Sequence, residues 1–435
     1  MRDPADLSAA AAAAAIRRGA LTSEALTAAC LARIAEREPA IRAFVDLRPD
    51  AALARARELD QRRPRDDEPL YGVPVAVKEV FDVAGYRCAW GTPIHAERVP
   101  DSDAAPVARL KAAGAVILGT AVSTEYAIAA PGPSTNPHDP RRTPGGSSSG
   151  PAAAVASGMA PLALGSQSIG SVIRPATYCG VLGLKPTFGA ISTLGGMALA
   201  EELDHVGILA RDADDVALAC RVLFGRDPDD PVSRDVLPPD TGAAAQPSHA
   251  LHVVGPLNAR VRSASERAVQ RAVDALRSAG VTVTRIELPA DFDRIEWITY
   301  TLLCRGIARH HGADYDRAAA SMSPRLRELV ERGRAISDAD HEAARSAARE
   351  TAHQLAVMLP AGTVAVNAAV DDVAPPLSEG TGAPILQALW TVAGLPALAV
   401  PCGRADGMPI GPQLAAGAGQ EASLLAAARL VMTKS

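Results

Sequence analysis

Apolar residues along the chain fall into two recurring patterns. Continuous apolar runs at residues 71–80, 115–120 and 251–257 predict buried β-strands. Apolar residues at helical spacing predict helices, for example over residues 104–114 and through most of 295–358. Because such strands and helices alternate along the whole length, the pattern predicts an α/β fold with a central mixed β-sheet covered by helices on both faces.

No internal repeat and no convincing boundary interrupts this alternation, so we expect one large domain over residues 1–435. Residues 1–65 would form amino-terminal helices, and residues 66–225 a core rich in special backbone geometry. Residues 226–435 would complete the sheet and supply variable walls of a substrate pocket. Within them, strand, helix and strand over residues 251–288 predict a parallel crossover unit.

Composition and charge exclude several classes of protein. The net charge of −5 provides no basic surface for nucleic acid, and only 3% of the residues are aromatic. No apolar run reaches the roughly 18 residues that a membrane span needs. The amino-terminal alanine run predicts a helix beginning near Ser8, not a secretion signal. Six separate cysteines without a CxxC pair are typical of a reducing compartment, so we expect a cytoplasmic protein.

Two loops rich in glycine and serine, at residues 145–150 and 165–171, are the most specialised stretch of the chain. Glycines allow close approach to the main chain, and serine hydroxyls can act as nucleophiles when a base is near. A flexible linker has a similar composition, but it would not alternate with apolar segments. Between the loops, residues 152–156 predict a helix and 161–164 a short buried strand or turn. Residues 173–192 predict a further strand and turn.

Lys78 is the single charged residue inside the apolar stretch 71–78. Removing an ammonium group from water is costly unless the group is paired or neutral. On an edge strand, its head could still reach water while its stem is covered. Alternatively, a buried lysine with a lowered pKa would serve as a base near neutral pH. The pattern alone leaves both interpretations open.

Other common catalytic devices are absent from the sequence. There is no HExxH motif and no Cys/His cluster, so no metal is implied, and no glycine-rich phosphate loop implies a nucleotide. Residues 146–150 match the GxSxG pattern of a nucleophile elbow. That elbow requires a strand leading into the serine, and the preceding residues RRTPGG cannot form one.

At this point the sequence resembles the amidase signature family. The resemblance is carried by PGGSSSGPAAAVASG at residues 144–158 and by PLALGSQSIGSVIRPATYCGVLGLKPT at 161–187. GVPVAVKEVFDVAG at residues 72–85 is similar to the lysine strand of that family. AGLPALAVPCGRADGMPIGPQL at residues 393–414 looks like its carboxy-terminal strand pair. Several motifs in the right order make the match specific, and they cover most of the chain.

The resemblance implies a Ser-cisSer-Lys triad. By motif position, Ser171 is the nucleophile, Ser147 is the bridging serine that follows a cis peptide bond, and Lys78 is the base. Ser171 would attack a carbonyl carbon while its proton passes through the Ser147 hydroxyl to a neutral Lys78 amine.

The same resemblance places an oxyanion hole at the backbone N–H groups of Ser168, Ile169 and Gly170. Ile169 stands where the commonest family pattern has glycine, and Gln167 where many members have aspartate. We expect both differences to affect the size and polarity of the substrate. Ser148 would support the site by bonding the lysine or the cis peptide, or would simply stabilise its loop.

Arg174 follows three residues after the predicted nucleophile. Many members have their arginine one position earlier, while a smaller set that acts on small carboxylated amides resembles this arrangement. The Arg174 guanidinium would then bind a substrate carboxylate. Alternatively, it would form a structural ion pair with a carboxylate such as that of Asp204.

The resemblance therefore implies a cofactor-free serine hydrolase that cleaves the C–N bond of a small-molecule amide through an acyl-enzyme. A carbamate (urethane) or an ester is within reach of the same chemistry. We expect no nucleic-acid or membrane partner and a monomer or homodimer. Two alternatives stay open: an amidotransferase subunit that hands ammonia to a partner, and a catalytically idle scaffold on the same fold.

Overall fold

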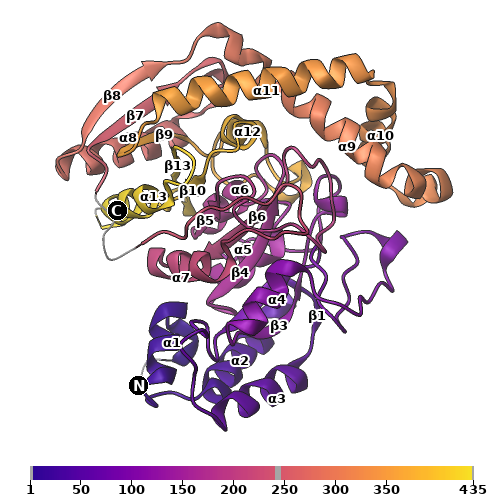
Figure 1. The fold of residues 1–435 in the computed structure, drawn as a ribbon, viewed down its shortest axis with the longest axis vertical. Coiled ribbons are helices and arrows are strands. Elements are labelled where there is room, and N and C mark those ends of the chain that lie inside the picture. The colour runs from indigo at the N-terminus through magenta and orange to yellow at the C-terminus, as the bar shows by residue number, and fades with distance from the viewer. Residues whose placement is uncertain (1–2, 241–245, 434–435) are drawn as a thin grey trace.

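A single eleven-stranded mixed sheet runs through the part of the chain that the computed structural model describes, residues 3–240 and 246–433. The strand order is β1-β3-β2-β4-β6-β5-β10-β13-β9-β7-β8 (Figure 1). The strands are β1 (Phe44–Leu47), β2 (Pro74–Lys78), β3 (Val116–Ala121), β4 (Leu162–Gln167), β5 (Leu182–Lys185), β6 (His205–Ala210), β7 (His249–Val254), β8 (Thr282–Glu287), β9 (Thr363–Ala368), β10 (Ala397–Ala399) and β13 (Pro412–Ala416). A separate small hairpin pairs β11 (Arg404–Ala405) with β12 (Met408–Pro409).

Helices cover both faces of this sheet, which confirms the predicted α/β architecture. They are α1 (Ala9–Arg17), α2 (Ser23–Ile41), α3 (Pro49–Asp60), α4 (Ala105–Ala112), α5 (Ser149–Ala156), α6 (Ile173–Cys179), α7 (Ala213–Leu223), α8 (Ser263–Ser278), α9 (Ile295–Ala318), α10 (Pro324–Ala335), α11 (Asp338–Met358), α12 (Ala388–Val392) and α13 (Glu421–Met432). Figure 1 shows α1 to α3 at the end of the molecule near β1, and α9 to α11 at the opposite end. Among the described residues, no helix combines the length and apolar character needed to cross a lipid bilayer.

Strand direction changes near the middle of the sheet. β2 lies between β3 and β4 and is parallel to both, whereas β6 is antiparallel to β4. The predicted crossover unit is confirmed, because β7 and β8 pair in parallel and α8 connects them. The carboxyl ends of β2, β3 and β4 therefore meet at one edge of the sheet, together with the beginning of β6.

The segment after the second Gly/Ser loop differs from its prediction. A strand and turn were expected over residues 173–192, but α6 occupies Ile173–Cys179 before β5 begins at Leu182. The side-chain oxygen of Gln167 accepts hydrogen bonds from the backbone N–H groups of Val172 and Ile173, at 2.8 and 3.1 Å. Donors at a helix start need such a partner, and a seven-residue helix is too short to show periodicity.

Candidate active site

The topology explains why residues far apart in sequence meet. Lys78 is the last residue of β2, and β4 ends at Gln167, so residues 165–167 of the second Gly/Ser loop belong to the strand and residues 168–171 follow it. Val77 pairs with Leu164 in the parallel register of these two strands. Ligand and catalytic groups in α/β sheets gather beyond the carboxyl ends of the strands, and here that edge receives both Lys78 and the loop.

Lys78 is fully buried on an interior strand, so the edge-strand alternative is wrong. Its Nζ atom lies 2.7 Å from Oγ of Ser147 and 2.8 Å from Oγ of Ser166, within hydrogen-bonding distance of both. Burial lowers the pKa of the Lys78 amine to about 7. Since burial penalises the charged form, a substantial fraction of this amine is neutral at neutral pH.

Ser147 reaches the lysine because its loop turns sharply before α5. Gly145 has φ +84°, a conformation that favours glycine, and the peptide bond between Gly146 and Ser147 is cis, as the resemblance implies. The backbone N–H of Thr124, which follows β3, donates to the Ser147 carbonyl at 3.3 Å. The loop is thereby held against the same sheet edge.

Ser171 and Ser147 line one cavity of about 150 Å³, which we call the inner cavity. The backbone N–H of Ser148 donates to the Ser171 carbonyl at 3.1 Å and ties the two loops together. The Ser171 hydroxyl makes no hydrogen bond to another residue in the described part of the chain. The structure thus contains the Lys78–Ser147 contact and places Ser171 in the same cavity, without a bond between the two serines. Hydrogen bonds of this kind often tighten only when substrate is bound.

Ser148 does not contact the lysine, in contrast to one of its two expected roles. Its hydroxyl instead exchanges hydrogen bonds with the backbone N–H and C=O of Ser166, both at 3.2 Å. Ser148 therefore stabilises the loop, the other role considered. Ser166 supplies the contact to Lys78 that sequence reasoning missed. Its place on β4, the parallel neighbour of the lysine strand, is the signal that could have revealed it.

The backbone of the second loop presents a row of unused donors. Within the described residues, the N–H groups of Ser168, Ile169, Gly170 and Ser171 donate no hydrogen bond. Consecutive free N–H groups beside a cavity are suited to binding a negative charge. Ile169 also contributes to the lining of the inner cavity, as its β-branched side chain predicted.

The loop is fixed from behind by two hydrogen bonds and is closely approached at Gly170. Thr391 donates to the Ile169 carbonyl at 2.7 Å, and the Ser168 hydroxyl donates to the Asp204 carboxylate at 2.5 Å. A Cβ atom on Gly170 would collide with Oε1 of Gln387, so a larger residue there requires the Gln387 side chain to move. The two hydrogen bonds hold the Ile169 carbonyl and the Ser168 side chain, while the backbone N–H groups of residues 168–171 stay free.

Asp204 precedes β6 and does not pair with Arg174, so the predicted ion pair is wrong. Besides Ser168, its carboxylate accepts hydrogen bonds from the backbone N–H groups of Leu199 and Ala200, at 2.7 and 3.0 Å. Burial raises the pKa of this carboxyl to about 6. Asp204 directly precedes His205, and His205 pairs with Gln167 in the antiparallel β4–β6 pair. Asp204 is therefore placed to support the loop that follows Gln167.

Arg174 instead lines the inner cavity from the first turn of α6. One nitrogen, Nη2, donates to the Gly146 carbonyl at 2.6 Å and to Thr381 Oγ1 at 3.3 Å. The other two, Nε and Nη1, are buried without a hydrogen-bond partner in the described residues. Burial lowers the pKa of this guanidinium. An unpaired buried cation is costly, which makes the missing partner informative.

Gln167 does not line the inner cavity. Its side chain is consumed by the α6 amino terminus and by a bond from Nε2 to Thr391 Oγ1 at 3.0 Å. The expected influence of Gln167 on substrate polarity is therefore replaced by a role in anchoring the loop. The residue holds the backbone that directly follows Ser171.

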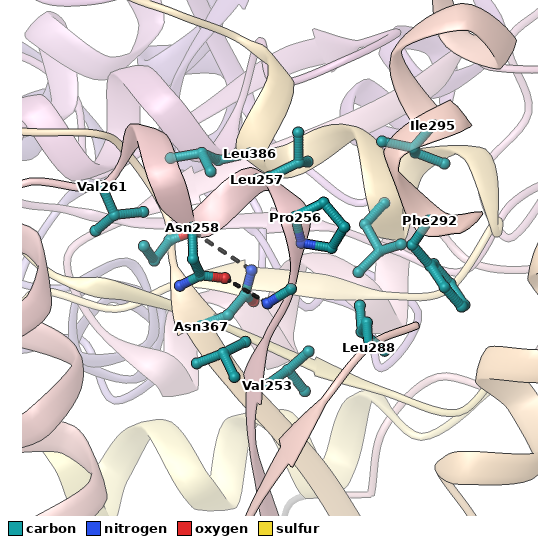
Figure 2. A pocket seen from close by; sticks show the side chains of 14 residues that line it. Val253, Pro256, Leu257, Asn258, Val261, Leu288, Phe292, Ile295, Asn367 and Leu386 are labelled. Carbon is teal, nitrogen blue, oxygen red and sulfur yellow. Dashed lines mark hydrogen bonds between the residues drawn. The ribbon is translucent and has the colours of Figure 1, made fainter. Parts of the chain in front are cut away.

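Two further cavities lie near the sheet. One, of about 480 Å³, touches Ser166, Ser168 and Asp204 but not Ser171. The other is a largely apolar pocket of about 30 Å³ that includes Val253, Phe292 and Leu386 and shares no lining residue with the inner cavity (Figure 2). It is too small for an amide substrate. No group of three or more potential metal ligands occurs among the described residues.

Comparison with known proteins finds relatives that match nearly the whole chain. The family model described as Amidase matches residues 25–425. A relative from Roseiflexus sp. (strain RS-1), named as a subunit of glutamyl-tRNA(Gln) amidotransferase, is 36% identical, with 94% of this chain and 93% of the relative covered. The peptide amidase of Stenotrophomonas maltophilia superposes with a TM-score of 0.86 at 29% identity, covering 98% of this chain and 96% of that one. A chain from a vestigial complex linked to the origins of an s-triazine catabolic enzyme gives a TM-score of 0.89 at 29% identity, with 98% of both chains covered. The chain therefore belongs to the amidase signature family.

Proposed function

We propose that this protein hydrolyses the C–N bond of a small-molecule amide through an acyl-enzyme on Ser171. The observation that carries the proposal is the buried Lys78 amine, 2.7 Å from the Ser147 hydroxyl and with a pKa of about 7. A neutral amine at that distance can accept a proton, and Ser147 and Ser171 line the same cavity. The whole-chain likeness to a solved peptide amidase supports the same class of reaction.

In the proposed reaction, Ser171 Oγ attacks the amide carbonyl carbon. Its proton moves to Ser147 Oγ, whose own proton passes to the Lys78 amine. The negative oxygen of the tetrahedral intermediate is stabilised by the free N–H groups of Ser168, Ile169 and Gly170, and a single donor of this kind typically contributes about 3 kcal/mol. Collapse of the intermediate breaks the C–N bond, and the proton returns along the same path to the leaving amine. Water then attacks the carbonyl of the acyl-enzyme ester, and its proton follows the same path to Lys78. This step releases the acid and regenerates Ser171.

The unpaired Arg174 guanidinium favours a substrate whose acyl part carries a carboxylate. Nε and Nη1 have no partner among the described residues, and the residue is 5% exposed. A carboxylate in the inner cavity would satisfy these donors and neutralise the charge. An amide is the preferred substrate, and a carbamate or an ester presents the same carbonyl to Ser171.

The curated relatives favour a second candidate. Chains named as one subunit of glutamyl-tRNA(Gln) amidotransferase match along nearly their whole length at 34–36% identity. In that role, the same site would release ammonia from an amide donor and pass it to a partner protein. This candidate predicts glutamine-dependent activity that appears only when a partner is added.

A fluorophosphonate probe and a substrate panel together test the proposal. The isolated protein is expected to be labelled at Ser171 and to hydrolyse at least one member of a panel of aryl amides, carbamates, esters and dicarboxylic monoamides. Ser171→Ala serves as the control for both readouts. Absence of labelling and of turnover in the folded protein would refute the hydrolase proposal. Glutamine-dependent turnover restricted to a partner complex would favour the amidotransferase.

A further inference from the structure

An open cleft adjoins the inner cavity between α9 and α10. It has a volume of about 410 Å³ and is lined by Glu296, Trp297, Tyr300, Arg325 and Arg332. Two of these residues, Tyr300 and Arg325, also line the inner cavity that contains Ser171. We call this space the outer cleft. The shared residues show that the outer cleft and the inner cavity are neighbours on either side of Tyr300 and Arg325.

The size of the inner cavity makes the outer cleft relevant to substrate binding. At about 150 Å³, the inner cavity is smaller than the roughly 300–1,000 Å³ of typical small-molecule sites. A substrate of ordinary size therefore extends beyond the inner cavity, and the outer cleft adjoins that cavity at Tyr300 and Arg325. The outer cleft is the space that receives this extension.

Positive charge dominates the walls of the outer cleft. The Arg332 guanidinium lies over the Tyr300 ring, 5.5 Å from its centre, and forms no ion pair with a carboxylate in the described part of the chain. Arg325 lies over the same ring at 6.0 Å and pairs with Glu328 at 2.8 Å. Glu296, the one acidic residue of the lining, is itself paired with Arg260 at 2.7 Å.

The cleft thus combines one uncompensated cation with aromatic surface. Trp297 is 42% exposed, which is unusual for a large aromatic side chain, and it lies beside Tyr300 in the lining. Aromatic surface receives the apolar stem of a ligand, while a guanidinium binds a carboxylate with two parallel hydrogen bonds. The protein as a whole has a net charge of −5, so this local excess of positive charge runs against its overall balance.

We propose that the outer cleft is a second substrate subsite, which binds a carboxylate on the arm of the amide substrate that extends out of the inner cavity. Arg332 binds the carboxylate, and Trp297 and Tyr300 contact the stem. The identity of the bound molecule as a substrate rests on the proposed hydrolase function. The subsite itself is a statement about binding and is testable without turnover.

The test measures binding in the Ser171→Ala background, where the ligands are not expected to be consumed. Two matched pairs of probes place the carboxylate on either arm of the amide: adipic acid monoanilide against its methyl ester, and an N-acetylated ω-amino acid against its methyl ester. Isothermal titration calorimetry gives the dissociation constants. For at least one pair, we expect the acid to bind about 10-fold more tightly than the ester. Arg332→Gln should remove this difference and leave ester binding unchanged.

Arg327→Gln is the matched control, because it removes one positive charge from the same helix at a residue that does not line the cleft. Its side chain donates one hydrogen bond, to the Ala319 carbonyl at 3.3 Å. We expect this variant to keep the preference for the acid. Equal binding of acid and ester in both probe pairs would overturn the subsite. An equal loss of the preference for the acid in Arg332→Gln and Arg327→Gln would overturn it as well.

Trp297→Ala separates the contact with the stem from the contact with the charge. This variant should weaken acid and ester by a similar factor of about 3 to 5, and melting temperatures check that each variant is folded. An unchanged affinity for both ligands would remove Trp297 from the subsite. Since these are binding measurements, they stand even if the protein fails to hydrolyse amides. Failure of the hydrolase proposal is detected separately, by the absence of probe labelling at Ser171.

Discussion

The amine nitrogen of Lys78 lies 2.7 Å from the hydroxyl oxygen of Ser147, although the two residues are 69 positions apart along the chain. The contact joins the end of an interior strand to a loop that begins a helix. Burial brings the pKa of the amine to about 7, and no carboxylate in the described residues forms an ion pair with it. The proposed chemistry depends on this relationship, because it leaves an uncharged base beside a hydroxyl.

Replacing the lysine by methionine tests the base. Lys78→Met keeps the length of the side chain and its apolar stem but cannot accept a proton. We expect kcat/KM for an amide to fall by about 10³-fold or more, within the range attributed to general-base catalysis. Release of aniline from an anilide measures this effect. Lys111→Met, at a partly exposed lysine paired with Asp103, is the control and should keep its activity. Near wild-type turnover in Lys78→Met would remove the lysine from the mechanism.

Ser166 is expected to raise the pKa of the Lys78 amine without contacting the substrate. Ser166→Ala removes one of the two hydroxyls within hydrogen-bonding distance of the Lys78 amine. An acceptor stabilises the ammonium form more than the neutral form, so its loss should move the midpoint of the pH–rate profile to lower pH. We further expect kcat to fall by about 10-fold with little change in KM. An unchanged midpoint and rate would show that Ser166 has no influence on the base.

The sequence predicted the fold for identifiable reasons, and the resemblance to the amidase signature family led to the proposal that Lys78, Ser147 and Ser171 act in one site. Continuous apolar runs and helical spacing are strong signals, and motif order placed Lys78, Ser147 and Ser171 in one site. Ser166 was missed because its role depends on the register of two parallel strands, which no local pattern encodes. The ion pair between Arg174 and Asp204 was wrong because both side chains are engaged by backbone groups that only the folded loops supply.

Helix α6 was also not predicted from the sequence. It is short, and its start is satisfied by the Gln167 side chain, whose amide the sequence suggested for contact with substrate. The outer cleft was also beyond reach, since Tyr300 and Arg332 come together only through the packing of α9 on α10. Tertiary contacts thus decide the details that local patterns leave open.

Little space is left for a side chain at Gly170 in the second Gly/Ser loop, which we propose as the oxyanion hole. A methyl group in Gly170→Ala would collide with the Gln387 side chain and displace the neighbouring N–H groups. We expect kcat to fall by about 10²-fold, comparable to the loss of one oxyanion donor. The double variant Gly170→Ala/Gln387→Ala opens the space and should recover part of the rate. Full activity in the single variant would contradict the assignment of this loop.

Arg174 is predicted to select substrates with a short carboxylated arm. The ratio of kcat/KM for succinic acid monoanilide to that for its methyl ester should fall by at least about 10-fold in Arg174→Gln, because the buried charge that binds the carboxylate is lost. Aniline release measures both substrates, so hydrolysis of the methyl ester does not interfere. Thr381→Val removes a hydrogen-bond partner of this guanidinium without changing the charge and should preserve the ratio. A ratio that stays constant in Arg174→Gln would assign the arginine to support of Gly146 alone.

In the proposed mechanism, an uncharged Lys78 activates Ser171 through Ser147. The most direct measurement is the rate of fluorophosphonate labelling of Ser171 between pH 5 and pH 9 in the wild-type protein and in Lys78→Met. Because burial lowers the pKa of the amine to about 7, the wild-type rate should rise with pH, with a midpoint near 7, and level off above it. The Lys78→Met rate should be low at every pH and should lack this midpoint. A wild-type rate that is independent of pH across this window, or the same rise in Lys78→Met, would contradict the account.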